Sequence, residues 1–197
     1  MDYINNVNNK IEVGGTMRIL DTAFHDVKIL HFNCKEDIRG SMSVTIDHAE
    51  MVSEGIYFNC KEQRMYSMAR KGTFFGIHFQ NKAYPQNKLI HLLSGSGLDY
   101  IIDLKKDSLT YKKWIAIEIN GGDNQHIYIP QGYGHAFLAL EDNTTQLFSI
   151  SEPFHQGESK QIRFDDKQIN LTFPIEITAI SDYDRNAPFL DEIDVDV

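Results

Sequence analysis

Long apolar runs are missing from this 197-residue chain. No stretch approaches the roughly 18 apolar residues that a membrane-spanning helix needs. The polar start MDYINNVNNKIEV also lacks the apolar segment of a secretory signal. The sequence therefore predicts a protein that neither spans a membrane nor carries a leader peptide.

Cysteine and positive charge are also scarce. Cys34 and Cys60 form neither a closely spaced metal-binding pair nor a disulfide framework, and free thiols favour the cytoplasm. The chain has 19 Lys and Arg against 28 Asp and Glu, a net charge of -9 at pH 7. Because nucleic-acid surfaces need clustered Lys and Arg, this balance argues against nucleic-acid binding. It still allows a small basic pocket for a phosphate-bearing ligand.

What the chain does contain is a series of short segments rich in β-branched and aromatic residues, separated by turn residues. They are VKILHF, SVTI, FFGIHF, KLIHLLSG, LDYIIDL, KWIAIEI, QHIYIP and HAFLAL. Short strands at such spacing indicate an all-β antiparallel sandwich or barrel. Residues 99–104 and 125–130 partly alternate polar with apolar, which is typical of half-buried strands. Short helices are expected only near residues 165–168 and after Ser181.

The chain reads as one domain with two flanking pieces. Residues 1–16 are predicted to be a flexible extension, and residues 17–190 a single domain. Residues 191–197 are predicted to be an exposed acidic tail.

One turn carries a recognisable pattern. PQGYGH, residues 130–135, matches Pro-x-Gly-x-x-His, which resembles the second motif of the cupin family. An ordinary turn with an incidental histidine is the alternative. The counterpart strand GIHFQ offers only His78 and Gln80, with no glutamate at metal-ligand spacing. Since two imidazoles and an amide make a poor divalent site, we expect no metal and no other cofactor.

The order of the motifs is more specific than any one of them. The chain runs DIRGSM, GTFFGIHFQ, QNKLIHLLSG, DLKKDSLTYKKW, IYIPQGYGHAFLAL and SDYDRNAP. This series resembles the dTDP-4-dehydrorhamnose 3,5-epimerase (RmlC-like) family of cupin nucleotide-sugar epimerases over about residues 17–190. The resemblance implies a cupin-type antiparallel jelly-roll or β-sandwich barrel, a few short helices near the C-terminus, and a homodimer.

The resemblance also implies catalytic roles. His78 stands at the family's base position, Asp184 at the position of the aspartate that orients this base, and Lys88 at that of the lysine facing the developing enolate. His135 matches a second pocket histidine near the sugar or the diphosphate. The alternatives stay open at this point: His78 as a core histidine, Lys88 as a solvated turn lysine and Asp184 as a helix N-cap.

The implied substrate-binding set includes several departures from the family pattern. Besides His135, its members are Arg39, Gln63, Ser67, Gln80, Phe75, Phe148 and Phe154. Phe75 replaces the family's arginine, and Phe148 replaces its catalytic tyrosine, so this position has no hydroxyl to return a proton. Water, Tyr133 or Tyr84 are candidates for that step. Met65 replaces an asparagine near the nucleotide, so CDP- and GDP-linked sugars stay open beside dTDP.

The function implied is epimerisation of a nucleoside-diphosphate-linked 4-keto-6-deoxy sugar at C3, C5 or both, in deoxysugar synthesis for a surface polysaccharide such as O-antigen. Loss of the tyrosine makes C3-only epimerisation one option. A catalytically inactive homologue that binds a nucleotide sugar is the first alternative. A cupin sugar-nucleotide ketoisomerase is the second.

Overall fold

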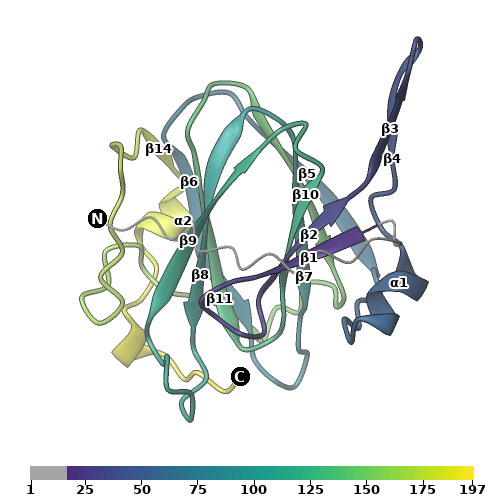
Figure 1. Cartoon of the computed structure of the whole chain (residues 1–197). Helices are drawn as coiled ribbons and strands as arrows, with labels where there is room; N and C mark the ends of the chain where they lie inside the picture. The colour runs from purple at the N-terminus through teal and green to yellow at the C-terminus, as the bar shows by residue number, and fades with distance from the viewer. Residues whose placement is uncertain (1–16) are drawn as a thin grey trace.

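Two antiparallel six-stranded sheets face each other and enclose the interior of the molecule (Figure 1). The computed structural model describes residues 17–197, so the predicted extension lies outside the described residues. The first sheet, called sheet A here, has the order β1-β2-β10-β7-β12-β5. Its strands are β1 (Met17–Asp21), β2 (Lys28–Phe32), β5 (Glu62–Met68), β7 (Lys88–Ser94), β10 (Gln125–Ile129) and β12 (Thr144–Ile150).

The second sheet, called sheet C here, has a main path β13-β6-β11-β8-β9, and β14 pairs with β6 in parallel. Its strands are β6 (Thr73–Gln80), β8 (Ser96–Asp103), β9 (Trp114–Asn120), β11 (Tyr133–Ala139), β13 (Ser159–Gln161) and β14 (Ala179–Ile180). The all-β prediction is therefore confirmed.

A hairpin projects from the body of the molecule beside sheet A (Figure 1). It consists of β3 (Cys34–Asp37) and β4 (Gly40–Ser43). Its apolar residues Ile38 and Met42 are fully and largely exposed. The strand expected over residues 43–46 is wrong, because β4 ends at Ser43.

Three short helices complete the fold. They are α1 (His48–Ser53), α2 (Asp182–Arg185) and the 3-10 helix η1 (Leu190–Glu192). The helix expected after Ser181 is confirmed as α2, whereas residues 165–168 form turns. Helix α1 was not predicted; it packs through Met51, which is fully buried. No helix within residues 17–197 is long and apolar enough to span a bilayer.

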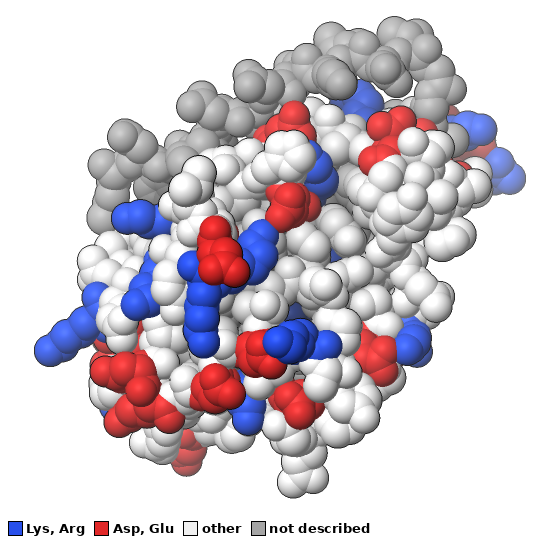
Figure 2. Space-filling view, turned by 90° about the horizontal axis from the view of Figure 1, so that it is seen from below, with Lys and Arg blue, Asp and Glu red and all other residues white. Residues whose placement is uncertain are grey.

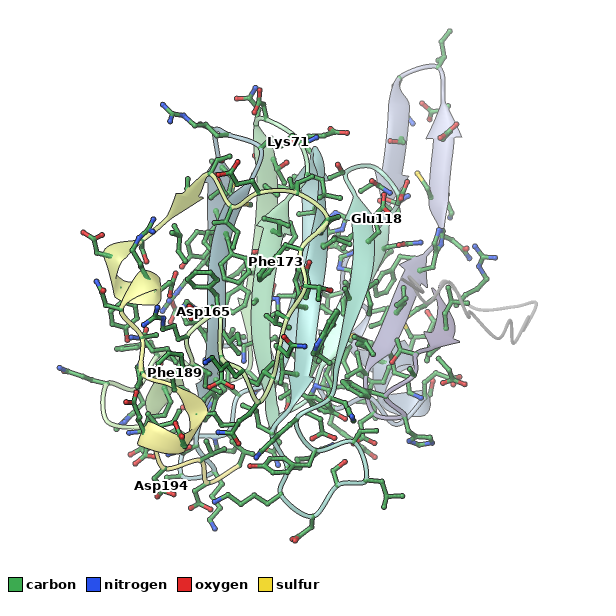
Figure 3. The ribbon with its side chains drawn as sticks, turned by 90° about the vertical axis from the view of Figure 1, so that its left-hand side faces the viewer. Lys71, Glu118, Asp165, Phe173, Phe189 and Asp194 are labelled. Carbon is green, nitrogen blue, oxygen red and sulfur yellow. The ribbon has the colours of Figure 1, made fainter. Side chains whose placement is uncertain are left out.

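Sheet C is buried on both faces, contrary to the half-buried pattern predicted for residues 99–104. On β8, Ile101 belongs to the core between the sheets, whereas Tyr100 and Ile102 belong to a second core. That second core forms where the C-terminal segment, residues 162–197, crosses the outside of sheet C (Figure 3). Phe173 of this segment lies over the sheet, with its ring centroid 5.5 Å from that of Tyr100.

The end of the chain is part of this covering layer. Val195 is buried, and the backbone N–H of Lys82 donates to the carbonyl of Asp196 at 2.6 Å. The expectation of an exposed tail is therefore wrong for Val195. On the face drawn in Figure 2, acidic and basic side chains are interspersed, and neither sign covers a continuous area.

Candidate active site

A cavity of about 400 Å³ opens into the space between the two sheets. Sheet C contributes Phe75, His78, Gln80 and His135 to its lining. Sheet A contributes Arg64, Tyr66, Lys88, Gln146, Phe148 and Ile150. The cavity therefore has two walls, each built by strands of one sheet.

A bulge at Gly76 decides which side chains of β6 enter this cavity. Phe75 pairs with Phe137 and His78 pairs with His135, so three steps on β6 match two on β11. The extra residue lets Phe75 and His78 both face inward, although an odd spacing would normally point them to opposite faces. Gly76 has a φ of +117°, and a Cβ there would lie 2.5 Å from Cα of Ala136. Only glycine fits this bulge.

His78 is paired with a buried carboxylate. Its Nε2 lies 2.6 Å from Oδ1 of Asp184, whose side chain is 5% exposed, while the imidazole is 41% exposed and lines the cavity. Since a carboxylate only accepts, the neutral imidazole donates through Nε2–H and keeps its lone pair on Nδ1. Such a pair fixes the tautomer and orientation of a general base.

Helix α2 delivers Asp184 to this position. The Ser181 hydroxyl caps the helix by accepting from the backbone N–H of Asp184 at 3.0 Å. The N-cap is thus Ser181, so the reading of Asp184 as a helix cap is wrong. The carboxylate is left free to bind His78.

A second group of ionisable side chains is more deeply buried. Asp99 is fully buried, Lys88 is 3% exposed and His135 is 6% exposed. Nε2 of His135 is hydrogen-bonded to Oδ1 of Asp99. Burial raises the pKa of Asp99, and the nearby His135 and Lys88 oppose this rise. Burial also lowers the pKa of Lys88 to about 8, an effect that Asp99 partly offsets.

Lys88 is therefore not a solvated turn lysine. It lies on β7 in the wall opposite His78 and lines the cavity. A cation with few water contacts stabilises a developing oxyanion far more than one in bulk water. The two walls thus bring the imidazole of His78 and the buried lysine Lys88 to one cavity.

Nε2 of Gln146 and Oδ2 of Asp99 are among the buried side-chain polar atoms of residues 17–197 that have no hydrogen-bond partner. Gln146 is 1% exposed and lines the cavity. An unpaired buried amide is unfavourable, so a ligand oxygen is the kind of partner this atom lacks.

Phe75 and Phe148, which stand where the family pattern has an arginine and a tyrosine, form aromatic contacts. The ring of Phe75 lies 4.8 Å from that of Tyr66, and Phe148 stacks on His135 at 5.8 Å. Neither ring can donate a proton from a hydroxyl. Both narrow the cavity with apolar surface.

Other predicted binding residues are placed differently. Gln80 lines the cavity, but its amide bonds the backbone of Tyr84 and His155 at 2.8 Å each and so fastens a loop. Phe154 lines the cavity and is 54% exposed. Of the two tyrosines considered as proton donors, neither lines the cavity: Tyr84 stacks on His155, and the Tyr133 hydroxyl accepts from Lys105.

Three predicted binding residues also lie outside the lining. Arg39 is on the projecting hairpin and pairs with Asp37. Gln63 and Ser67 are exposed residues of β5, and Gln63 donates to the Ser149 hydroxyl at 2.8 Å. Their binding roles stay predictions.

Arg64 and Tyr66 were not predicted, yet both line the cavity from the same strand. Because side chains alternate along a strand, choosing Gln63 and Ser67 selected the outer face. Gln146 was also missed. It lies two residues before Phe148 and therefore on the same face, which was the available signal.

Metal ligation has no support in the described part of the chain. Within residues 17–197, no group of three His, Cys, Asp or Glu side chains is arranged to hold a metal ion.

The two-sheet barrel with its interior site is a cupin fold, of the kind found in nucleotide-sugar epimerases. The chain belongs to the dTDP-4-dehydrorhamnose 3,5-epimerase family, whose model matches residues 21–192. It is 30% identical to dTDP-4-dehydrorhamnose 3,5-epimerase from Methanothermobacter thermautotrophicus over 172 residues, which cover 86% of this chain and 92% of the relative.

Solved structures give the same result for the fold. The chain matches the Bacillus anthracis dTDP-4-dehydrorhamnose 3,5-epimerase crystallised with TDP and PPi, with a TM-score of 0.84 and 28% identity over 88% of this chain and 99% of that one. A 3'-monoepimerase from Streptomyces bikiniensis in complex with dTDP-quinovose matches with a TM-score of 0.79 and 23% identity over 87% of each chain. This last likeness concerns the fold alone.

Proposed function

We propose that the protein epimerises a carbon next to the ketone of a nucleoside-diphosphate-linked 4-keto-6-deoxy sugar. The observation that carries this proposal is the His78–Asp184 pair on one wall and the buried Lys88 on the other. Carbons flanking a ketone lose protons readily, because the charge moves to oxygen. The reaction needs a base, a cation at that oxygen and an acid.

The residues fit the first two needs. Nδ1 of His78 takes the proton as the C–H bond breaks, and the electron pair moves onto the ketone oxygen to give an enolate. The Lys88 ammonium stabilises this oxygen, and Asp184 stabilises the imidazolium. The C–H bond then re-forms on the opposite face. Since Phe148 has no hydroxyl where the family has its catalytic tyrosine, we expect epimerisation at a single carbon.

A cationic group at the cavity suits a diphosphate. Lys160 lines it, although the chain as a whole is acidic. A local basic site can oppose the global charge. The nucleoside diphosphate is dTDP, CDP or GDP, and the setting we propose is cytoplasmic deoxysugar synthesis for a surface polysaccharide.

We also propose that the protein is a homodimer. Ile38 and Met42 on the projecting hairpin, together with Met65 and Leu93 on sheet A, are large exposed apolar side chains. A hairpin that leaves its own protomer is suited to contact a second one, and Arg39 would then lie against the partner. Light scattering that gives the mass of a single chain at micromolar concentration would contradict this part.

A binding protein without catalysis is the main alternative. Buried Lys88 and Asp99 argue against it, because unused buried charges are costly and a site without chemistry would tolerate apolar replacements. A ketoisomerase is the other alternative. It would move the carbonyl group from one carbon to its neighbour, whereas an epimerase leaves it in place.

One experiment separates these functions. The protein is incubated in deuterium oxide with 4-keto-6-deoxy sugars linked to dTDP, CDP and GDP, and C3 and C5 are followed by proton NMR and mass. We expect deuterium and inversion at one carbon with one nucleotide. His78→Asn should abolish exchange, whereas His25→Asn, a change at a side chain 96% exposed, should not. Lack of exchange with every substrate would support the binding protein, and a moved carbonyl the ketoisomerase.

A further inference from the structure

Inversion at carbon requires an acid on the wall that faces the base. His78 and Asp184 come from β6 and α2 on the sheet C side. A proton that returned from this side would restore the original configuration. A side chain that acts as this acid must therefore come from sheet A, whose lining strands are β5, β7 and β12.

The polar side chains of that wall differ in their fitness as acids. Arg64 stays charged at any working pH, and the amide of Gln146 does not donate a proton to carbon. Lys88 is needed as a cation at the enolate oxygen. Among the described residues, Tyr66 is the one phenol that sheet A contributes to the lining. Tyr183, the other lining tyrosine, lies beside His78 on the base's side, with ring centroids 6.4 Å apart.

The position of Tyr66 is defined by its neighbours. It pairs with Gln146 on β12, and the next inward pair on these strands is Arg64 with Phe148. Its ring packs on Phe75 at 4.8 Å, and Phe75 faces the cavity because of the bulge at Gly76. Tyr66 thus lies one pair along from the inert ring of Phe148 on the same wall.

The cation beside Tyr66 is Arg64, and a cation there would stabilise the phenolate that remains after Tyr66 donates its proton. Arg64 lies two residues before Tyr66 on β5, so both side chains point to the same face of the strand, and both line the cavity. Glu62, and more weakly the phenol of Tyr66, raise the pKa of the Arg64 guanidinium. A guanidinium close to a phenol oxygen stabilises the phenolate formed when the proton leaves. Arg64 is itself held by Glu62, so the cation has a fixed position.

We propose that Tyr66 is the catalytic acid that returns the proton on the face opposite His78, with Arg64 stabilising the phenolate. In this step the O–H bond of Tyr66 breaks, its proton forms the new C–H bond, and the enolate electrons supply that bond as the ketone re-forms. The phenolate is reprotonated from the imidazolium of His78 through solvent, which returns both groups to their starting states. This inference rests on the proposed function.

The decisive variant is Tyr66→Phe, which keeps the ring on Phe75 and removes the O–H alone. In deuterium oxide we expect inversion to fall by about 10² to 10³-fold, the usual worth of a general acid. Deuterium should still enter the substrate with retained configuration, because His78 can exchange its proton with solvent and return it from its own face. Tyr57→Phe, at an exposed tyrosine outside the cavity lining, is the matched control and should lose neither process.

A second variant keeps the test independent of local damage. Tyr66→Phe combined with Phe148→Tyr restores a phenol to the same wall from the adjoining strand, and we expect it to recover part of the inversion. Thermal unfolding first verifies that each variant folds like the parent.

Four results decide the matter. Exchange without inversion in Tyr66→Phe supports the acid. Inversion within about threefold of the parent would overturn it, and so would an equal loss of exchange and inversion, which indicates a binding role. A parent protein that exchanges no deuterium at all would remove the proposed function and this inference with it.

Discussion

Replacing Lys88 with methionine should stabilise the protein at neutral pH and remove its activity. The side chain is 3% exposed, and burial lowers its pKa from 10.5 to about 8. A shift of this size corresponds to about 3 kcal/mol of unfavourable free energy. Lys88→Met keeps an extended apolar chain without the charge. Asp99 then loses a neighbouring cation, which offsets part of this gain. We therefore expect the free energy of unfolding at pH 7 to rise by about 1 to 3 kcal/mol.

The pH dependence gives the effect its sign. The pKa of Lys88 is lower in the folded than in the unfolded state, so the unfolded chain binds more protons between about pH 8 and pH 10.5. Stability contributed by this group therefore rises as the pH rises through that window. Between pH 7 and about pH 9.5 the parent should gain about 2 kcal/mol from Lys88. Lys88→Met lacks this gain, so the difference between the two proteins should shrink.

Urea unfolding at both pH values, followed by circular dichroism, measures this difference, and deuterium exchange into substrate measures activity. Lys160→Met is the matched control for the unfolding measurement, because Lys160 also lines the cavity but is only partly buried. The reasoning would be refuted by a variant destabilised by more than about 1 kcal/mol at pH 7. A parent–variant difference independent of pH, or exchange at near-parental rate, would refute it equally.

Three further changes test other parts of the site. Asp184→Asn should slow exchange by about 10² to 10³-fold with little change in KM. Asp182→Asn, on the same helix, should leave the rate of exchange unchanged. Equal losses in the two variants would contradict a catalytic role for the His78–Asp184 pair. Gly76→Ala should lower the free energy of unfolding by at least about 2 kcal/mol in urea. Gly157→Ala should be nearly neutral, because its added Cβ would meet no atom closer than 4.0 Å. Gln146→Leu should raise that free energy by about 1 kcal/mol and raise KM; unchanged KM would show that the amide does not meet the substrate.

The fold could be predicted because strand patterns are local. Alternating apolar and aromatic segments with turn residues between them place most strands of both sheets within a residue or two. The burial of β8 could not be predicted in this way, because its second covering layer comes from residues 162–197. An apolar face looks the same in sequence whether water or a distant segment covers it.

Only some residues of the site could be predicted, because others depend on contacts between distant segments or on the phase of a strand. The pairing of His78 with Asp184 joins residues 106 positions apart, and only family order suggested it. On β5 the phase of the strand was undetermined, and a shift of one residue exchanges the whole inner set for the outer one. Tyr66 was missed for that reason. The Gly76 bulge was invisible too, since strict alternation would separate Phe75 from His78.

The C-terminal segment both seals the outside of sheet C and carries Asp184 to His78. We expect detachment of this segment to separate Asp184 from His78 while the interior core between the sheets stays in place. Under the proposed function, activity would then be lost before the barrel unfolds. A bulky fusion partner joined after Val197, two residues beyond the buried Val195, should lower turnover before it lowers the melting temperature of the barrel.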